Sequence, residues 1–447
     1  MAGAETGAYM RQRLTHPNPY ERALRNESSL LPMNTPLENL PESCDVLVVG
    51  AGPAGSAAAI TLARNGLDVV LVDQHSFPRD KICGDGLIPD AHRALAELGV
   101  LDEVMQRAQA AQFVRCTSPR GRQLDVQGTL AVLPRKQLDE IICRAAVRAG
   151  ARMYAPLRLN RLVEEDGQVV GAYLQQGSEQ RQLRARWVVL ATGAVPQALM
   201  DAGMALRQRP SAVALRCYIR NPAMTQEING LEVLFHRSLA PGYGWIFPCG
   251  QGVFNVGVGI VQPAGTKREA AGQMNLREMF HKLGGLSDTA RRLFEGGEQM
   301  GPLKGAPLRY SLEGATLSRP GLLVTGEAAG STYALTGEGI GKALETGILA
   351  AQAIALGAKS AQGGQAPAFS EAQVRDHYQA QVDALRPRFH LYERAQAASA
   401  SPWLTELLLW RAQKSPRLRR GLAGILNEST DPSRRFSLKD MVRLLSS

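Results

Sequence analysis

Three glycines near the start of the chain, Gly50, Gly52 and Gly55, stand in a G-x-G-x-x-G pattern. Gly50 permits a tight turn, Gly52 lets the backbone come close to a pyrophosphate, and Gly55 allows a helix to pack closely on a strand. Asp73 follows roughly 20 residues later, where its carboxylate can accept hydrogen bonds from the hydroxyls of a ribose. We therefore predict an adenine dinucleotide site formed by Gly50, Gly52, Pro53, Ala54, Gly55 and Asp73.

The residues around these glycines supply the elements that would position them. Residues 46–49 form an apolar run typical of a buried strand, and residues 69–72 form a second run that ends at Asp73. Between them lies a segment rich in Ala and Leu that we expect to be a helix, with Gly66 as its C-cap. Its N-terminus would point free N–H groups and the positive end of the helix dipole at the phosphates. This strand–helix–strand unit favours a dinucleotide site over a glycine-rich turn with only a structural role.

The same pattern returns late in the chain. Residues 322–324 form a short apolar run, glycine-rich turns follow over residues 326–341, and a long helix is expected to about residue 356. Residues 206–312 have the pattern of short strands and turns, which indicates a separate antiparallel sheet. We therefore expect the dinucleotide-binding domain to be discontinuous, with the sheet inserted between its two parts.

Composition limits the classes of function. The chain has 447 residues and a net charge of +10, so its surface should attract anions such as diphosphates, acidic lipids or an acidic protein. No zinc-finger, RNA-recognition or basic-zipper pattern supports binding to nucleic acid. The six cysteines are scattered without a C-x-x-C and the seven histidines do not cluster, so we expect neither a metal site nor a disulfide framework.

We expect a cytoplasmic protein with at most peripheral association with a membrane. The N-terminus lacks the apolar stretch of a signal peptide. No run of about 18 apolar residues is present that could cross a bilayer. Residues 386–447 hold twelve Lys or Arg against five Asp or Glu, a balance that a diphosphate, an acidic membrane or an acidic partner would favour.

Five stretches together carry a family resemblance over roughly residues 44–440: GAGPAG at 50–55, FPRDKICGDGL at 77–87, Arg135, GYGWIFP at 242–248, and GEAAG…TGEGIGKAL at 326–344. The chain resembles the geranylgeranyl reductase-like family of FAD-dependent oxidoreductases. That family lies within the para-hydroxybenzoate hydroxylase-like superfamily, which also holds aromatic hydroxylases and flavin-dependent halogenases. The resemblance implies FAD as the cofactor.

With FAD as the implied cofactor, the predicted fold class is α/β. We expect a Rossmann-like FAD-binding domain, an inserted antiparallel β-sheet substrate domain and a helical C-terminal region. The expected boundaries are an N-terminal extension at 1–43, the discontinuous FAD-binding domain at 44–205 and 313–360, the substrate domain at 206–312, and the basic helical region at 361–447.

The resemblance also implies which residues contact FAD. Cys83 and Gly84 would lie against the isoalloxazine, while Arg79 and Lys81 would contact phosphate or solvent. Arg135 would approach the pyrophosphate, where a guanidinium can bind two oxygens at once. The remaining implied contacts are Thr192, Gly193, Gly326, Glu327, Gly337, Gly339 and Ile340.

Some of these positions depart from the family pattern or have a specific role. Glu327 stands where the family has an Asp that holds the ribityl chain, so the charge is kept with a reach one methylene longer. Thr192 and Gly193 follow a buried strand where the hydroxylases carry Asp-Gly, and the missing Asp weakens a hydroxylase interpretation. The helix that begins after Gly337 would point N–H groups at the N1–C2=O edge of the flavin, where negative charge accumulates on reduction.

Three aromatic residues, Tyr243, Trp245 and Phe247, alternate along one predicted strand and therefore share one face. They could be plain sheet core or the wall of a substrate cavity, and the resemblance favours a substrate-facing Tyr243 or Trp245. A further apolar stretch, residues 403–410, could cover the substrate domain as a core helix or present an amphipathic surface to a lipid or polypeptide.

The implied function is that of an FAD-dependent oxidoreductase acting on an apolar substrate. The first interpretation is reduction of a C=C bond in a prenyl or polyene chain, with Cys83 or Tyr243 supplying the proton and Trp245 beside the substrate. The alternative is a monooxygenase that hydroxylates an aromatic ring, possibly on a peptide or larger carrier, through a flavin C4a-hydroperoxide. A halogenase or a non-catalytic flavoprotein ranks below both. Because no second dinucleotide fingerprint is present, the electron donor would be transiently bound NAD(P)H or a separate flavin reductase.

Overall fold

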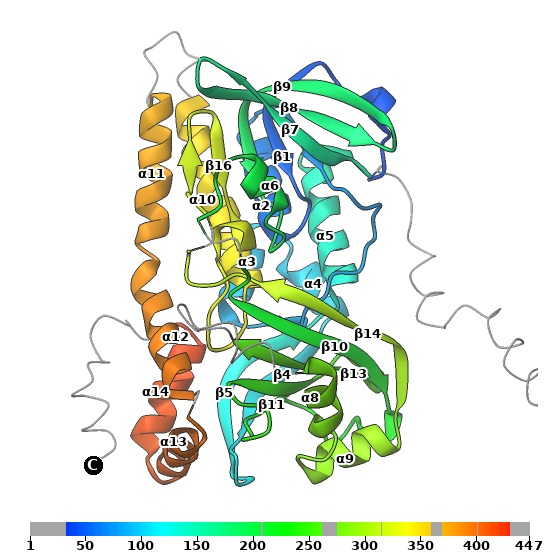
Figure 1. Ribbon diagram of the computed structural model, residues 1–447, viewed down its shortest axis with the longest axis vertical. Helices are drawn as coiled ribbons and strands as arrows, with labels where there is room; N and C mark the ends of the chain where they lie inside the picture. The colour runs from blue at the N-terminus through cyan, green and yellow to red at the C-terminus, as the bar shows by residue number, and fades with distance from the viewer. Residues whose placement is uncertain are drawn as a thin grey trace, which may run out of the picture. The chain divides into compact units, whose positions relative to one another are not determined.

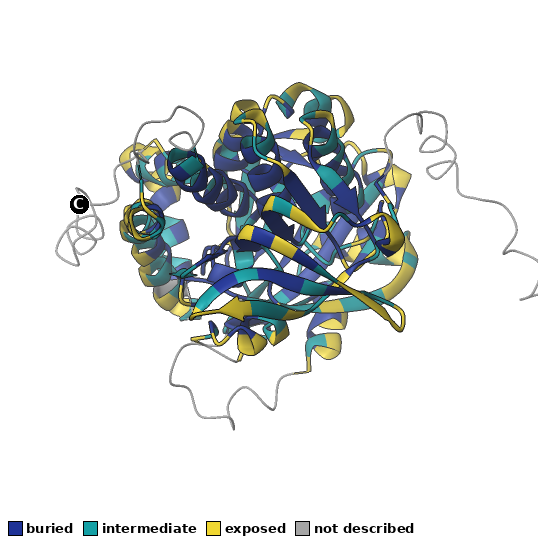
Figure 2. Cartoon of the chain, turned by 90° about the horizontal axis from the view of Figure 1, so that it is seen from above, coloured by how far each residue is buried: buried dark blue, intermediate teal, exposed yellow. Residues whose placement is uncertain are grey.

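The computed structural model of the chain describes residues 33–206, 209–261, 275–313, 315–358, 369–399 and 401–429. These residues form two sheets, flanking helices and a helical C-terminal region (Figure 1), which confirms the predicted α/β class. Buried residues gather where the helices meet the sheets, and exposed residues lie on the outer faces (Figure 2). Residues 1–32 of the predicted N-terminal extension lie outside the described residues.

The first sheet carries the glycine-rich turn. Its strands are β1 (Ser43–Val49), β2 (Val69–Val72), β6 (Arg152–Tyr154), β7 (Arg158–Glu165), β8 (Gln168–Gln176), β9 (Glu179–Leu190), β15 (Ser318–Arg319) and β16 (Leu322–Val324). β1 lies in the middle and pairs in parallel with β2 and β9, and β9 pairs in parallel with β16. Consecutive residues of β1 and β2 are buried, so both faces of these strands are covered, as is usual in a parallel sheet.

Two helices pack together beside this sheet: α2 (Pro53–Arg64), directly after the glycine-rich turn, and α10 (Ile340–Ala358). Their backbones come close at Gly347, where a Cβ would lie only 2.2 Å from the Ala54 carbonyl oxygen. This contact joins segments almost 300 residues apart, so the late glycine-rich turns lie beside the early one. The other helices here are α3 (Pro89–Glu97), α4 (Leu101–Arg107) and α5 (Arg135–Arg148).

The second sheet contains the strands predicted in the substrate region. In spatial order they are β14 (Glu298–Leu308), β10 (Ala212–Arg220), β13 (Val253–Val261), β12 (Gly242–Pro248), β11 (Leu231–Leu234), β4 (Gln109–Thr117), β5 (Gln123–Val132) and β3 (Gly86–Leu87). The sequence predicts two strands around a turn over residues 112–126, and the structure has them as the antiparallel pair β4 and β5. The structure also pairs β4 in parallel with β11, which the sequence did not predict. The alternation of apolar residues predicts a strand but not its partner, so this long-range pairing could not be read from the sequence.

Two helices lie in the segment where the sequence pattern predicts only strands and turns: α8 (Leu276–Leu283) and α9 (Asp288–Glu295). Asn275 and Ser287 cap their N-termini by accepting hydrogen bonds from backbone amides of the first turn. Leu283 is buried with the apolar side chains of the second sheet. A capping residue before apolar residues at helical spacing is the signal that would have predicted both helices.

The C-terminal region is formed by α11 (Glu371–Asp383), α12 (Arg386–Ser399), α13 (Pro402–Lys414) and α14 (Pro416–Leu426). α11 lies beside α10 and the first sheet, and α12 to α14 lie beside the second sheet (Figure 1). α13 and α14 pack on β5, where Leu409 and Leu418 are buried with Leu124. The apolar stretch at 403–410 therefore covers the sheet through Leu409, although Trp403 at its start is 69% exposed.

Residues 33–42 pack on the first sheet. Met33, Leu37 and Leu40 are buried, and the Asn34 side chain donates to the Phe77 carbonyl oxygen at 2.8 Å. The short helical segments of the chain are η1 (Leu37–Asn39), α6 (Gln197–Asp201), η2 (Pro222–Met224) and η3 (Gly326–Ala329). Within the described ranges, no helix is long and apolar enough to cross a membrane, and no group of His, Cys, Asp or Glu could hold a metal ion.

Candidate functional site

One large cavity, of about 1870 Å³, extends from the glycine-rich turn of the first sheet past the second sheet to the C-terminal helices. A site for a single small ligand usually occupies roughly 300–1,000 Å³, so this cavity has room for a cofactor and a further large molecule. The predicted site residues all line it except two, Gly55 and Gly326. Those two glycines instead allow the backbone around the cavity to pack.

The glycine-rich turn has the close contacts that its glycines predict. Gly50 has a φ of +104°, and a Cβ there would lie 2.3 Å from the Ala191 carbonyl oxygen. A Cβ on Gly55 would lie 1.7 Å from the Gly50 carbonyl oxygen. Neither position can hold a side chain, because each Cβ would overlap a backbone atom. The turn therefore closes tightly against the loop after β9.

Asp73 lies at the end of β2 with its carboxylate already engaged. Its Oδ2 accepts a hydrogen bond from the Ala51 amide at 3.0 Å and forms an ion pair with Arg79 at 3.1 Å. Its Oδ1 accepts from the His75 amide at 2.9 Å. The carboxylate thus ties the glycine-rich turn to the loop that carries Arg79, and its contact with a ribose stays a prediction.

Two arginines face the glycine-rich turn through a shared buried carboxylate. Asp139 of α5, whose side chain has no exposed surface, accepts from Arg79 at 2.9 Å and from Arg135 at 2.6 Å and 2.8 Å. Both guanidiniums reach the turn, since a Cβ on Gly52 would lie 3.6 Å from Arg79 Nη2 and 3.7 Å from Arg135 Nη2. Two fixed cations beside free backbone N–H groups fit a diphosphate. Asp139 lies four residues after Arg135 on the same face of α5, and it was not predicted as a site residue from the sequence.

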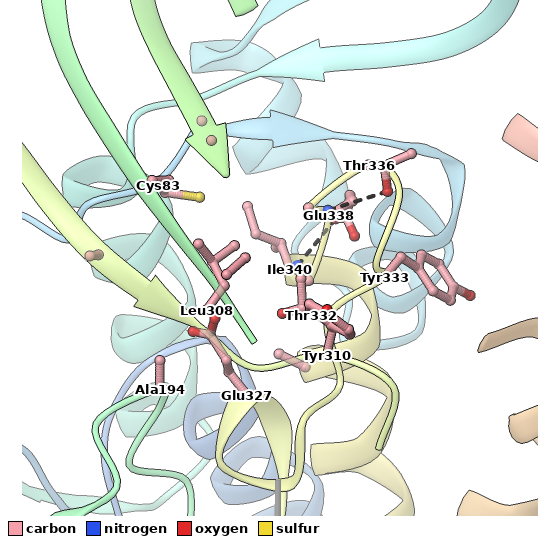
Figure 3. Close-up of a pocket in the computed structure, with 18 of the residues that line it drawn as sticks. Cys83, Ala194, Leu308, Tyr310, Glu327, Thr332, Tyr333, Thr336, Glu338 and Ile340 are labelled. Carbon is pink, nitrogen blue, oxygen red and sulfur yellow. Dashed lines mark hydrogen bonds between the residues drawn. The ribbon is translucent and has the colours of Figure 1, made fainter. Parts of the chain in front are cut away.

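The loop before β3 places Lys81, Cys83 and Gly84 on the cavity wall. Burial raises the pKa of the Cys83 thiol, although the nearby Arg135 guanidinium lowers it, so the thiol keeps its proton at neutral pH. The Cys83 side chain projects into the cavity in Figure 3. A Cβ on Gly84 would lie 3.4 Å from the ring of Phe247, so the small residue brings this loop against the aromatic strand.

A buried polar network behind Cys83 was not found from the sequence. Asp85 Oδ2 accepts hydrogen bonds from the Tyr218 hydroxyl at 2.6 Å and from Asn255 Nδ2 at 2.7 Å. Asn255 also donates to the Cys83 carbonyl oxygen at 2.8 Å and accepts from Trp245 Nε1 at 2.9 Å. Burial raises the pKa of Asp85 to about 6 despite these hydrogen bonds. The network fixes the Cys83 loop to the second sheet.

The aromatic residues of β12 share one face, as predicted from their alternation. The ring centroids of Tyr243 and Trp245 lie 6.3 Å apart and those of Trp245 and Phe247 6.4 Å apart. All three line the cavity, so they form its wall as well as part of the sheet. Trp245 lies flat over Gly257, whose Cβ would stand 2.2 Å from the indole ring. The Tyr243 hydroxyl donates to the Thr336 carbonyl oxygen at 2.6 Å.

The late turns complete the cofactor end of the cavity. Gly326 has a φ of +67° and packs on α2, where its Cβ would lie 2.6 Å from the Ala54 Cβ. Glu327, which stands in place of the family's Asp, lines the cavity. In the turn after the neighbouring strand β9, Gly193 has a φ of +75°, and the Thr192 hydroxyl is buried without a hydrogen-bond partner among the described residues. An unpartnered buried hydroxyl facing a cavity is suited to a bound polar group.

The start of α10 also faces the cavity. Gly337, Gly339 and Ile340 line it, together with Glu338, which sequence patterns did not single out (Figure 3). A Cβ on Gly339 would lie 2.4 Å from the Thr332 hydroxyl, so glycine is needed for the turn to fold over this residue. The helix N-terminus is thus held at the cavity surface as predicted, and its amides are considered further below.

The far end of the cavity is apolar. Its wall consists of side chains of β4 and β5 on one side and of α12, α13 and α14 on the other, including Val114, Leu124, Val126, Leu404, Leu408 and Leu422. These six side chains carry no charge, but Arg394 of α12 also lines this end. The helical C-terminal region therefore forms part of the site, an arrangement that the sequence left open between a core helix and a surface helix.

Comparison with known proteins agrees with this geometry. Residues 43–285 match the family described as FAD binding domain. The chain is 34% identical over 327 residues to the menaquinone reductase of Mycolicibacterium smegmatis, a match that covers 70% of this chain and 76% of that protein. It is 30% identical over 326 residues to digeranylgeranylglycerophospholipid reductase 2 of Methanosphaera stadtmanae, covering 69% of this chain and 78% of that protein.

Among solved structures, a geranylgeranyl bacteriochlorophyll reductase-like protein from Thermoplasma acidophilum has the same fold. Its TM-score is 0.73 at 21% identity, and the match covers 90% of this chain and 99% of that chain. The fit of the paired arginines and the glycine-rich turn to a diphosphate is what an FAD site requires. The chain belongs to the geranylgeranyl reductase-like family of FAD-dependent oxidoreductases.

Proposed function

We propose that this FAD-dependent oxidoreductase saturates C=C bonds of a long prenyl or polyene chain. The observation that carries the proposal is the continuity of the cavity, which runs from the diphosphate end to an apolar end between β5 and the helices α13 and α14. Its size and its mainly aliphatic far wall suit a long hydrocarbon better than a single aromatic ring. The names of the two relatives, menaquinone reductase and digeranylgeranylglycerophospholipid reductase, point to the same class of substrate.

At the cofactor end, Arg79 and Arg135 would hold the diphosphate of FAD, and Glu327 would hold its ribityl chain. When bound, FAD supplies the hydride for the reaction. NAD(P)H or a separate flavin reductase would reduce the flavin, because the chain has one dinucleotide-binding turn in the described residues and no second. The aromatic residues Tyr243 and Trp245 would orient the hydrocarbon and exclude water from it.

We assign the proton donor to Cys83. Burial keeps its thiol protonated, and the thiol projects into the cavity (Figure 3). The Tyr243 hydroxyl is less suited, because its proton is already donated to the Thr336 carbonyl oxygen at 2.6 Å. Positioned general acids contribute roughly 100- to 10,000-fold to a rate.

Exposed apolar side chains beside the cavity support a substrate that arrives from a lipid phase. Val195 lines the cavity and is 56% exposed, and Met200 of the adjoining α6 is 37% exposed. We therefore expect peripheral contact with a membrane at this rim. A basic chain of net charge +10 would favour an acidic lipid surface.

The test is an anaerobic reaction of the FAD-loaded protein, reduced with dithionite, with a geranylgeranyl-bearing lipid. Mass spectrometry should find two hydrogens added for each saturated C=C bond. The Cys83→Ala variant should react about 100-fold more slowly. Cys217→Ala, which removes a buried thiol away from the cavity, should react at the normal rate. In a parallel reaction under air, stoichiometric consumption of O₂ with an oxygenated product, and no saturated lipid in either reaction, would establish the monooxygenase alternative instead.

A further inference from the structure

The N-terminus of α10 is occupied by a side chain of the protein itself. Glu338 Oε1 accepts hydrogen bonds from the Ile340 amide at 3.1 Å and from the Gly341 amide at 3.2 Å (Figure 3). Its other oxygen, Oε2, is buried and receives no hydrogen bond from any described residue. The Thr336 hydroxyl accepts from the Glu338 amide at 3.3 Å and helps to fix the loop. The carboxylate thus sits where a helix N-terminus favours negative charge.

One of these two amides, that of Ile340, belongs to a residue that lines the cavity where FAD would bind. N–H groups at a helix start attract the electronegative edge of a flavin. The Ile340 amide has a single hydrogen to donate. A flavin oxygen and the Glu338 carboxylate would therefore compete for it.

We propose that the Glu338 carboxylate and the pyrimidine edge of FAD are alternative occupants of the N-terminus of α10. FAD must then displace Glu338 to bind fully, and Glu338 closes the helix end when FAD leaves. This inference depends on FAD binding and not on the identity of the substrate.

Charged groups of the neighbouring elements surround Glu338 and determine the strength of its hydrogen bonds to the two amides. Asp90 of α3 lies on the other side of Gly341, whose Cβ would stand 2.3 Å from the Asp90 carboxyl carbon. Lys342 of α10 lies 3.7 Å from Asp90 Oδ2 and 3.2 Å from Glu428, just beyond α14. The further groups packed around this cluster are Arg93, Tyr333, Glu345, Arg388 and Tyr392.

These neighbouring groups make the competition between Glu338 and FAD dependent on pH. Burial first, and then the charge of Asp90, raise the pKa of Glu338 well above its usual value, while Lys342 lowers it. Below that raised pKa, Glu338 is protonated and loses the charge that strengthens its hydrogen bonds to the amides. Above it, the carboxylate competes at full strength. The affinity for FAD should therefore fall as the pH rises through the pKa of Glu338.

The experiment measures the dissociation constant of FAD for the full-length chain stripped of its cofactor, across a range of pH and without substrate. If the carboxylate occupies the amides about nine-tenths of the time, the apparent dissociation constant is raised about tenfold. Glu338→Gln and Glu338→Ala should therefore bind FAD about tenfold more tightly at alkaline pH, with a flat pH profile. Glu97→Gln, which removes an exposed carboxylate that contacts α10 only through Gln352, should behave as the unaltered protein.

Two results would overturn the proposal. Weaker FAD binding by both Glu338 variants would mean that Glu338 holds the cofactor instead of competing with it. Unchanged affinity with an unchanged pH profile would mean that the two never share the amides. Circular dichroism of each variant confirms that its fold is intact before the titration. None of these measurements depends on whether a prenyl chain is reduced.

Discussion

At the end of the cavity beside α2, the chemistry is carried by charges that hold one another in place, whereas the wall beside α13 is mainly aliphatic and Arg394 of α12 brings a charge to it. Asp139 joins Arg79 and Arg135 within 2.9 Å, and all three side chains are at least seven-eighths buried. The far end is lined by aliphatic side chains such as Leu404 and Leu408. Directional ion pairs fix the position of a ligand, but apolar walls fix only its shape and length.

The difference suggests that the two ends tolerate change unequally. A buried ion pair that loses one partner leaves an uncompensated charge, which is costly. An apolar wall that loses a methyl group leaves a small cavity, which costs less. The cofactor end should therefore be sensitive to single substitutions, and the substrate end should change its preference before it loses stability.

The largest effect is expected from Asp139→Ala. This change leaves Arg79 and Arg135 without their shared carboxylate, and the free energy of unfolding should fall by about 3–5 kcal/mol. FAD binding should weaken as well, because the two guanidiniums lose their fixed positions. Urea denaturation and FAD titration measure the two effects.

A matched control is Asp125→Ala, which breaks the half-exposed ion pair with Arg115 in the second sheet. Its cost should be at most about 1 kcal/mol, with FAD affinity unchanged. Equal losses in the two variants would contradict the contrast between the ends of the cavity.

A smaller effect is expected at Glu428, whose hydrogen bonds and ion pairs hold the end of the C-terminal helices in place. Glu428 follows α14 and receives the Tyr333 hydroxyl at 2.7 Å, Lys342 at 3.2 Å and Arg388 at 2.5 Å, with an ion pair to Arg93. Its side chain is 1% exposed. Glu428→Gln keeps the shape but removes the charge, so we expect a loss of about 2–3 kcal/mol. Limited proteolysis should cut residues 401–429 faster.

Glu428→Gln should affect ligand binding at the two ends of the cavity differently. At a pH above the pKa of Glu338, where the charge of Glu428 no longer affects the ionisation of Glu338, FAD affinity should stay within about twofold of the unaltered protein, whereas binding of a long apolar ligand should weaken. Equal weakening of both would show that the C-terminal helices support the cofactor end too. Glu393→Gln, which removes a carboxylate of α12 that pairs with the exposed His390, provides the control.

Asp85 lies between the cofactor end and the apolar end of the cavity. The pH dependence of stability tests what its buried carboxyl contributes there. Burial raises its pKa from an ordinary 3.8 to about 6, so between these values the folded protein binds more protons than the unfolded chain. Stability should therefore fall as the pH rises from about 4 to 6, by up to about 3 kcal/mol, and change no further from this group above pH 6. Asp85→Asn should remove that slope. Urea denaturation at several pH values measures it, and an equally steep slope in the variant would assign it to other carboxyls, such as Asp90 or Glu232.

The cofactor end was largely predictable from the sequence because its signals are local. The turn at Gly50, the strand end at Asp73 and the helix start at Arg135 each lie within a short run whose spacing fixes the backbone. Asp139 could not be predicted as a site residue, because a single acidic residue on a helix has no pattern of its own. Its role became visible only when Arg79, 60 residues earlier in the chain, was brought to it by the fold.

The substrate end was less predictable because its contacts are between distant segments. The strand pattern of residues 112–126 predicted the hairpin of β4 and β5 but not its partner β11, more than 100 residues after β4. Apolar residues at 403–410 favoured a helix but not the wall that it covers. Hydrophobic contacts are not directional, so a periodic pattern shows which face is buried and not what it is buried against.

The smallest effect on stability, and the sharpest test of the contrast, is expected at Leu408. This half-buried side chain of α13 lines the far end of the cavity, more than 250 residues along the chain from Asp139. Leu408→Trp fills part of that end, so a reductase of long prenyl chains should come to prefer shorter ones, with stability changed by about 1 kcal/mol and FAD affinity unchanged. Competition between lipids of two chain lengths in one reaction measures the preference directly. Trp403→Ala, at the exposed start of the same helix, should leave that preference as it is. An unchanged preference in Leu408→Trp would mean that the hydrocarbon ends before α13, and the aromatic wall at Trp245 would then set the length of the substrate.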